Sequence, residues 1–215
     1  LKIFPNIADK IFLFPGAAAR NISGVHERKV ENTVKGKIKI LSVARIHPRK
    51  GQDQILSAIH ALPTKLKDNI ECVFAGPIIK ERFYKQLLEQ SKGLGFKITF
   101  LGDLNDKQLK KCYQEADIFA LASMPRSNSV EGFGFVYLEA SSHGLPILAH
   151  NIGGVEDAVK DGITGSLTNP QNPSELKHAL ATLIEDNILR SKMGKAGKEW
   201  AKDHTWEKLA KKLYI

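Results

Sequence analysis

Short apolar runs alternate with stretches of helical periodicity along most of the chain. Runs rich in Val, Ile and Phe and bounded by Gly or Pro are typical of strands in a parallel sheet that is covered on both faces. They lie at residues 38–44, 70–76, 96–102, 117–122 and 146–149. Between them, apolar residues recur at spacings of three and four, which predicts helices. This alternation predicts the α/β fold class, with a doubly wound, Rossmann-like parallel sheet and helices on both faces.

The two ends of the chain differ from this middle. Residues 1–36 hold Pro5, Pro15 and Gly16 without clear alternation, so they are predicted to be an interdomain linker and the tail of a preceding domain. Residues 37–204 are predicted to be one domain and residues 205–215 a C-terminal helix. The chain starts at Leu1 without the layout of a signal peptide, and we interpret it as a piece of a longer protein.

Composition narrows the class of protein. The chain has 215 residues, 42% apolar and 26% charged, which is typical of a globular domain and excludes disorder and fibrous repeats. No apolar run approaches the roughly 20 residues that span a bilayer. Cys72 and Cys112 have no close Cys or His partner in the sequence, which fits a reducing, cytoplasmic location.

Positive charge is concentrated near the start of the predicted domain. The net charge is +9, and eight basic residues but a single acid lie between Arg28 and Lys50. No aromatic residue interleaves with them, so a nucleic-acid partner is not expected. For residues 28–39 two interpretations stay open: a solvated basic surface, or peripheral contact with the anionic inner face of a membrane.

Two cations, Arg45 and Lys50, lie in the loop after the first predicted strand. In open α/β sheets, such loops at the carboxyl edge bind ligands. Cations beside a helix N-terminus suit a phosphate, because the backbone N–H groups add to their charge. The alternative is an exposed basic turn. His47, between the cations, is expected to be structural or to line the site rather than to act as a base.

Two acids, Glu131 and Glu139, flank a glycine-rich turn. Gly132 and Gly134 permit close approach of a ligand to the backbone, and the helix expected to begin near Gly134 presents free N–H groups. The arrangement suits a ligand with hydroxyls at both ends and an anion between them. The alternative is that Glu139 is a satisfied core acid and Glu131 a helix-capping one.

A second glycine turn, Gly153-Gly154, opens a short predicted helix. These glycines either contact phosphate through their backbone or only form a tight turn.

In their order along the chain, these motifs resemble the C-terminal, donor-binding domain of retaining glycosyltransferases of the GT-B fold, the family 4 type. The resemblance runs from about residue 38 to residue 206, and its specificity lies in the combination. It rests on Arg45…Lys50-Gly51, Ala75-Gly76-Pro77, Phe100-Leu101-Gly102, Ala116-Asp117, Glu131-x7-Glu139, Gly144-Leu145-Pro146, Gly153-Gly154-x-Glu156, Asp161-Gly162-x-Thr164-Gly165 and Thr205-Trp206.

The resemblance implies a domain that binds a nucleoside-diphosphate sugar for transfer to an acceptor, which a missing N-terminal domain would hold. Arg45 and Lys50 would bind the pyrophosphate and stabilise the departing nucleotide, and Glu131 would bind the donor sugar. No metal and no cofactor besides the GDP- or UDP-sugar substrate are expected. The fragment alone is expected to be inactive.

The resemblance also implies the remaining donor contacts. Glu139 would hold the ribose hydroxyls, and Pro77 and Leu104 would lie beside the nucleobase. The backbone of the glycine-rich turn would touch sugar and phosphate, which involves Gly132, Phe133, Gly134 and Phe135. Residues 130–145 look most like transferases of the phosphatidylinositol-mannoside type, which favours GDP slightly over UDP and a role in glycolipid or polysaccharide synthesis.

Two other functions stay open. The chain could be a nucleotide-binding module without chemistry, or half of a sugar epimerase of the same architecture. The epimerase is not expected to share the pattern Glu131-Gly-Phe-Gly-x4-Glu139. One departure from the family is the linker, where Pro15-Gly16-Ala17 replaces the usual Pro-Asn-Gly.

Overall fold

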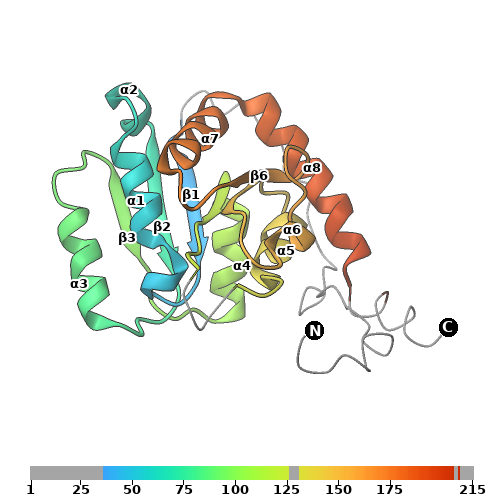
Figure 1. Cartoon of the computed structure of the whole chain (residues 1–215), viewed down its shortest axis with the longest axis horizontal. Coiled ribbons are helices and arrows are strands. Elements are labelled where there is room, and N and C mark those ends of the chain that lie inside the picture. Colours follow the sequence, from blue (N-terminus) through green and yellow to red (C-terminus); the bar gives the residue numbers. More distant parts are fainter. Residues whose placement is uncertain (1–35, 126–130, 206–207, 209–215) are drawn as a thin grey trace.

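A computed structural model describes residues 36–125, 131–205 and 208 of the chain (Figure 1). Its strands form one six-stranded sheet in the order β3-β2-β1-β4-β5-β6, and each neighbouring pair is parallel. The α/β fold class and the doubly wound parallel sheet are therefore confirmed. The strands are β1 (Ile38–Val43), β2 (Ile70–Ala75), β3 (Lys97–Phe100), β4 (Ile118–Leu121), β5 (Ile147–His150) and β6 (Gly165–Thr168).

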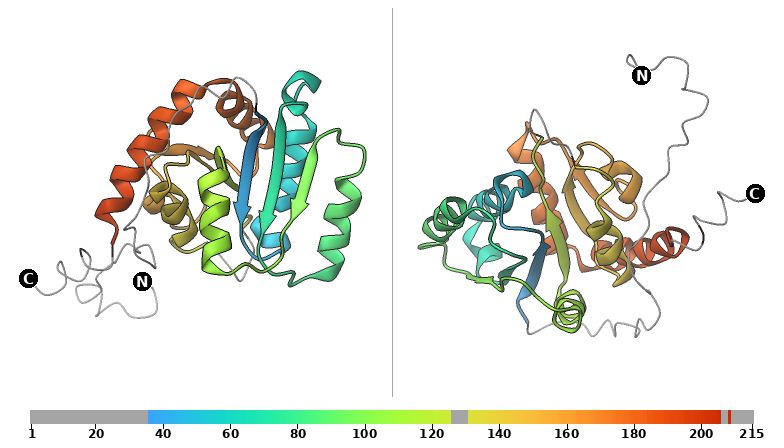
Figure 2. Two further views of the ribbon diagram at one scale, coloured as in Figure 1. Left: turned by 180° about the vertical axis from the view of Figure 1, so that it is seen from behind. Right: turned by 90° about the horizontal axis from the view of Figure 1, so that it is seen from below.

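Helices cover both faces of the sheet, as Figure 2 shows. One hydrophobic cluster lies between the sheet and α1, α3 and α7, and a second lies between the other face and α4, α5 and α6. Neighbouring strand residues such as Ile40 and Leu41 fall in different clusters, because successive side chains point to opposite faces. The helices are α1 (Gln52–His60), α2 (Thr64–Lys67), α3 (Glu81–Gln90), α4 (Asp106–Glu115), α5 (Phe135–Ser142), α6 (Val155–Ala158), α7 (Pro173–Glu185) and α8 (Asn187–Asp203).

The strand order places two loops side by side. Strand β1 pairs with β2 on one side and with β4 on the other, so the chain reverses its direction of winding between these strands. Ligands in such sheets bind outside the carboxyl ends of the strands at this switch point. The predicted cations lie in the loop after β1, and Glu131 lies between β4 and α5; Figure 2 views this edge in its right panel.

Four strands fall within the predicted runs and β5 extends one residue beyond its run, to His150, but β6 was missed. It has the sequence Gly-Ser-Leu-Thr and pairs only at the edge of the sheet, with β5, so it carries no apolar run. A Cβ on Gly165 would come within 2.3 Å of the Ile147 carbonyl oxygen, which explains why a glycine starts this strand.

The ends of the chain remain predictions. Apart from Gly36, Thr205 and Lys208, the predicted linker (1–36) and C-terminal helix (205–215) lie outside the described residues. Among the helices that the structure does describe, none combines the length and the apolar character needed to cross a membrane.

Candidate donor-binding site

A glycine brings the loop after β1 against the end of β4. Gly51 has φ of 65°, and a Cβ there would lie 1.7 Å from the Ala122 carbonyl oxygen. The neighbouring Met124 N–H donates to the Arg49 carbonyl at 2.8 Å. The 3₁₀ turn η2 (Pro48–Lys50) is thereby fixed beside the segment that follows β4.

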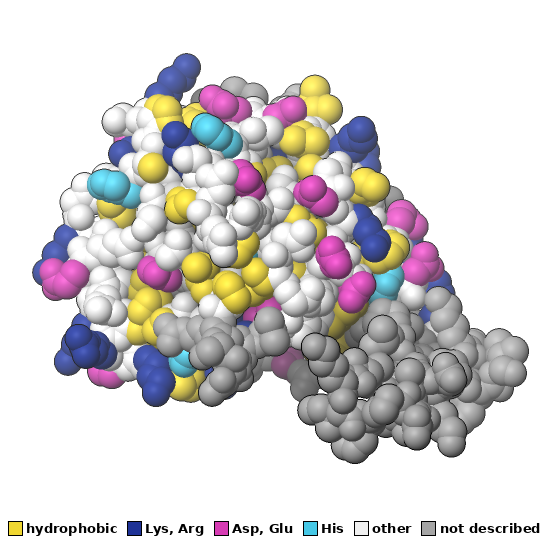
Figure 3. Space-filling model, in the orientation of Figure 1, with side chains coloured by type: hydrophobic (Ala, Val, Ile, Leu, Met, Phe, Trp, Pro, Cys, Tyr) yellow, Lys and Arg dark blue, Asp and Glu magenta, His cyan; other side chains and the backbone are white. Residues whose placement is uncertain are grey.

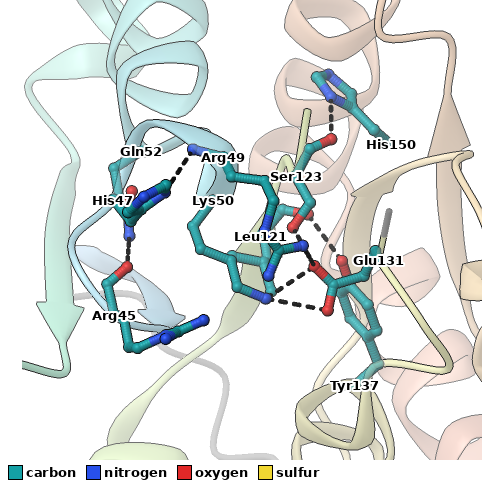
Figure 4. A network of polar contacts seen from close by, with 10 residues as sticks. All are labelled: Arg45, His47, Arg49, Lys50, Gln52, Leu121, Ser123, Glu131, Tyr137 and His150. Carbon is teal, nitrogen blue, oxygen red and sulfur yellow. Dashed lines mark hydrogen bonds and ion pairs between the residues drawn. The ribbon is translucent and has the colours of Figure 1, made fainter. Parts of the chain in front are cut away.

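Glu131 is the centre of the site (Figure 4). Its Oε2 lies 2.7 Å from Lys50 Nζ and 2.9 Å from Arg49 Nη1, and Oε1 lies 3.0 Å from Lys50 Nζ. Ser123 Oγ donates to Oε2 at 2.9 Å. Glu131 is only 8% exposed, so this buried carboxylate is neutralised by two cations and oriented by a hydroxyl.

The cations control the protonation of Glu131. Burial raises the pKa of this carboxyl, but hydrogen bonds from Lys50 and Ser123 and the charges of Lys50 and Arg49 outweigh it, so the pKa is lowered. The pKa of Lys50 is also lowered, by burial first and by its cationic neighbours Arg49 and Arg45. The two shifts have different causes: the cations and the Ser123 hydroxyl lower the pKa of Glu131, whereas burial is the first cause of the lowered pKa of Lys50.

Arg45 lies in the loop after β1, as predicted, and its role at the donor pyrophosphate stays a prediction. It is exposed and takes no part in the contacts of Glu131, although its charge reaches Lys50. Its carbonyl accepts from Gln52 Nε2 at 2.9 Å. The guanidinium bound to Glu131 belongs to Arg49, which the sequence analysis did not select; its position directly before Lys50 was the available signal.

His47 and His150 contact the backbone of two residues that bind Glu131, Arg49 and Ser123. His47 is the N-cap of η2, and its Nδ1 accepts from the Arg49 N–H at 3.1 Å, in line with the expected structural role. The buried His150 ring places Nδ1 3.1 Å from the Ser123 carbonyl oxygen. Burial lowers the pKa of His150, so a neutral ring donates this bond and fixes the residue whose hydroxyl holds Glu131.

The two glycine turns lie against each other. A Cβ on Gly153 would come within 2.0 Å of the Glu131 carbonyl oxygen, and the Gly154 N–H donates to that oxygen at 3.3 Å. The close approach of this turn to the Glu131 backbone therefore explains why glycines occupy these positions. Their contact with phosphate stays a prediction.

The turn before α5 also settles one alternative for Glu131. Helix α5 is preceded by Gly134, with φ of 74° and no side-chain capping bond, so Glu131 does not cap this helix.

The other predicted residues of this turn differ in exposure. Phe133 is half-buried and its ring centroid lies 5.8 Å from that of the exposed Phe135 and 6.2 Å from that of His204. Gly132 is exposed.

Glu139 lies in the middle of α5 and is half-buried. Tyr113 of α4 donates its hydroxyl to Glu139 Oε2 at 3.1 Å. The His143 ring stacks on Tyr113 with centroids 4.9 Å apart. Glu139 therefore has a polar partner in the helix layer, apart from the contacts of Glu131.

Pro77 and Leu104 follow β2 and β3, at the same edge of the sheet as the cations. Both are half-buried. The Pro77 carbonyl accepts from the Ile46 N–H at 2.9 Å, which ties the loop after β2 to the loop after β1. Leu104 packs against the core cluster that contains α5.

Within the described ranges 36–125 and 131–205, no three His, Cys, Asp or Glu residues form a group that could hold a metal ion. The polar cluster at the carboxyl edge instead offers a pair of cations, a carboxylate and a helix N-terminus. Such a set can bind a diphosphate together with a hydroxyl-bearing group.

Comparisons with known proteins agree on one family. The family described as "Glycosyl transferases group 1" matches residues 26–200. A GDP-mannose-dependent alpha-(1-6)-phosphatidylinositol monomannoside mannosyltransferase of Mycobacterium tuberculosis is 31% identical over 177 residues, which are 81% of this chain and 46% of that protein. A D-inositol 3-phosphate glycosyltransferase of Corynebacterium glutamicum is 32% identical over 80% of this chain and 41% of its own length.

Solved structures share the fold. The C-terminal domain of a glycosyl transferase group 1 family protein (LpcC) from Francisella tularensis matches with a TM-score of 0.68 and 24% identity, over 88% of this chain and 94% of that one. Anabaena HepE in complex with UDP-glucose matches with a TM-score of 0.70 and 25% identity, over 82% of this chain and 48% of that one. The chain thus spans about half the length of the curated relatives it matches.

Proposed function

Because this chain belongs to the family of group 1 glycosyl transferases, we propose that it is the donor-binding half of a retaining, metal-independent enzyme. It binds a nucleoside-diphosphate sugar, and the rest of the full-length protein holds the acceptor. The observation that carries this proposal is the cluster of Glu131, Lys50 and Arg49 at the switch point of the sheet.

The chemistry of the cluster matches the demands of sugar transfer. The bond between the sugar C1 and the phosphate oxygen breaks, and its electron pair leaves with the diphosphate. The acceptor oxygen bonds to C1 and its proton is released. Negative charge grows on the diphosphate in the transition state, and the Lys50 and Arg49 cations stabilise it there, which raises the rate. Arg45, exposed beside Lys50, supplies further positive charge.

Glu131 accepts hydrogen bonds from the donor sugar in this proposal. The carboxylate stays ionised at neutral pH because its pKa is lowered, and an ionised carboxylate only accepts. In the free protein its oxygens are bound to Arg49 and Lys50. The donor therefore exchanges partners with the site: its diphosphate takes the cations, and its sugar hydroxyls take the acid.

The donor is a GDP-sugar in preference to a UDP-sugar. The name of the mycobacterial relative specifies GDP-mannose, whereas Anabaena HepE was solved with UDP-glucose. The names of the curated relatives, phosphatidylinositol monomannoside and inositol 3-phosphate transferases, support a role in glycolipid synthesis, with a polysaccharide as the other acceptor class. Calorimetric titration of the chain with GDP and UDP tests this preference, and tight UDP binding without GDP binding overturns it.

Two substitutions test the division of roles. Glu139→Ala should weaken binding of the free nucleotide by roughly 1.5–3 kcal/mol, the worth of hydrogen bonds to a charged group. Glu131→Ala should leave free-nucleotide affinity equal or higher, because it releases two cations, but should remove the additional affinity for the nucleotide sugar. Glu156→Ala, at an exposed acid of α6, is the matched control.

Equal weakening of nucleotide and nucleotide sugar by Glu131→Ala would mean that the two acids have been assigned wrongly. A full-length protein that binds the nucleotide sugar yet transfers nothing to any acceptor would favour the binding module. Interconversion of free nucleotide sugars would favour the epimerase.

The proposal also includes peripheral contact with an anionic membrane. Most of the basic residues in 28–39 lie outside the described residues. Lys39, which is described, forms ion pairs: its Nζ lies 3.0 Å from Glu115 Oε2 and 3.3 Å from Glu71 Oε1. The face in Figure 3 shows acidic and basic side chains interspersed. Sedimentation with vesicles containing 30% phosphatidylserine tests this contact. Equal binding to anionic and to neutral vesicles would contradict the proposed contact.

A further inference from the structure

Helices α4 and α5 join three polar side chains on the face of the sheet that carries α5. Tyr113 donates its hydroxyl to Glu139 Oε2 at 3.1 Å. His143, one turn after Glu139, places its Nδ1 2.9 Å from the Glu139 carbonyl oxygen and stacks its ring on Tyr113 at an interplanar angle of 18°. Tyr113 thus contacts the carboxylate of Glu139, and His143 contacts its backbone.

We propose that Tyr113 is a positioning residue that holds the Glu139 carboxylate in the orientation in which it binds the ribose hydroxyls. This inference rests on the proposed function, in which Glu139 is the ribose-binding acid. It adds a second residue, from a different helix, to that subsite.

The Tyr113 ring is rigidly held. It is 3% exposed, with the Phe119 ring at 6.2 Å and the His143 ring at 4.9 Å between centroids. Burial and the adjacent Glu139 charge raise the pKa of Tyr113 well above its usual value. The phenol is therefore protonated at neutral pH and serves as a fixed donor.

A fixed donor matters because a glutamate side chain is flexible. Glu139 is half-buried, and a long side chain of this type loses rotamer entropy when a ligand orders it. A bond from a buried phenol orders the carboxylate before the ligand arrives. The carboxylate has about four acceptor positions, and the bond from Tyr113 takes one of them.

The test removes the hydroxyl alone. Tyr113→Phe should weaken binding of GDP and UDP roughly three- to tenfold, the worth of one hydrogen bond. The same variant should bind the 2′,3′-dideoxy forms of these nucleotides as the unmodified chain does, because the ribose hydroxyls are missing. In a Glu139→Gln background, Tyr113→Phe should add little. Tyr84→Phe, at a half-buried tyrosine of α3, is the matched control, and apo melting curves of each variant accompany the titrations.

The outcomes separate this inference from the proposed function. If Glu139→Gln weakens the ribonucleotides but not the dideoxy forms, and Tyr113→Phe changes neither, the inference is overturned and the ribose role of Glu139 stands. Equal weakening of ribose and dideoxy ligands by Tyr113→Phe shows a general structural role and also overturns it. If Glu139→Gln changes neither ligand, the ribose role itself fails, and the inference fails with it.

Discussion

Glu131 and Glu139 are eight residues apart, yet the fold gives them opposite surroundings. Glu131 lies on a loop, is 8% exposed and binds two cations from a segment 81 and 82 residues away in the sequence. Glu139 lies in a helix and receives a phenol hydroxyl from the neighbouring helix. Glu131 is thus neutralised by two cations, whereas Glu139 is oriented by a hydrogen bond from a tyrosine hydroxyl.

The difference shows how loops and helices contribute to one site. Loops at the switch point bring together charges that are remote in sequence, and their geometry depends on glycines such as Gly51 and Gly153. Helices hold a side chain at a fixed place through packing, which suits a contact that only needs direction. Three substitutions test this comparison.

The largest effect is expected at Gly51, which holds the loop after β1 against the end of β4. Alanine would adopt a left-handed conformation and overlap the Ala122 carbonyl, and each of these costs about 1–3 kcal/mol. Gly51→Ala should therefore lower the unfolding free energy by several kcal/mol in urea titrations. Gly93 also has φ of 70°, but no atom lies within 4 Å of a Cβ added there. Gly93→Ala should therefore lower the unfolding free energy only by the cost of the left-handed conformation. Equal losses in both variants would contradict the close approach.

An intermediate effect is expected when the charge of Glu131 is removed. Glu131→Gln leaves Arg49 and Lys50 without a counterion and should lower the unfolding free energy by about 1–3 kcal/mol at pH 7. Because the folded-state pKa of Glu131 is lowered, this stabilisation is complete above the unfolded carboxyl pKa of about 4.3. It disappears as the pH falls through the folded value.

The matched control for this variant is Glu89→Gln. Its ion pair to Lys92 is as short, 2.7 Å, but both side chains are about 70% exposed, so the change should cost about 0.5 kcal/mol or less. Chemical denaturation between pH 3 and 8 measures both variants. A difference between wild type and Glu131→Gln that does not shrink in acid would refute the ionised state of Glu131.

The smallest effect is expected at His143, beside Glu139. Burial lowers its pKa, and Lys110 and Lys198 add to this against the bond to the Glu139 backbone. Protonation therefore favours the unfolded state, and stability is lost as the pH falls below about 6.5, by at most about 1.4 kcal/mol per pH unit.

His143→Asn should make the decline of stability between pH 6.5 and 5 shallower. His178→Asn, at an exposed histidine of α7, is the matched control for the substitution itself. The pKa of His150 is lowered as well, so the difference between wild type and variant isolates His143. Parallel declines in wild type and His143→Asn would contradict the pKa shift.

The sequence predicted most of the fold because buried parallel strands carry continuous apolar runs. Local signals also agree with the fold: Asn105 caps α4 and forms a capping box with Gln108. The edge strand β6 has no such run, so periodicity could not identify it.

The site was predicted less completely. Glu131 and Lys50 are brought together, but their partners Arg49 and Ser123 could not be selected, because a 3₁₀ turn decides which adjacent cation points at the acid. Tyr113 was not selected either, because its hydroxyl contact depends on how α4 and α5 are placed. Spacing along the chain does not encode such inter-element distances.

The Glu131 ion pairs have a consequence for selectivity. Glu131 behaves as a tethered anion that occupies the cations Lys50 and Arg49 in the free protein. A short tether holds its group at an effective concentration in the millimolar range. A free phosphate or carboxylate metabolite must compete with this internal anion, and when it displaces Glu131 from the cations it leaves a buried carboxylate with only the Ser123 hydroxyl as a described partner. A ligand that carries hydroxyls beside its phosphates satisfies the cations and the acid together, so we expect the site to select such ligands over simple anions.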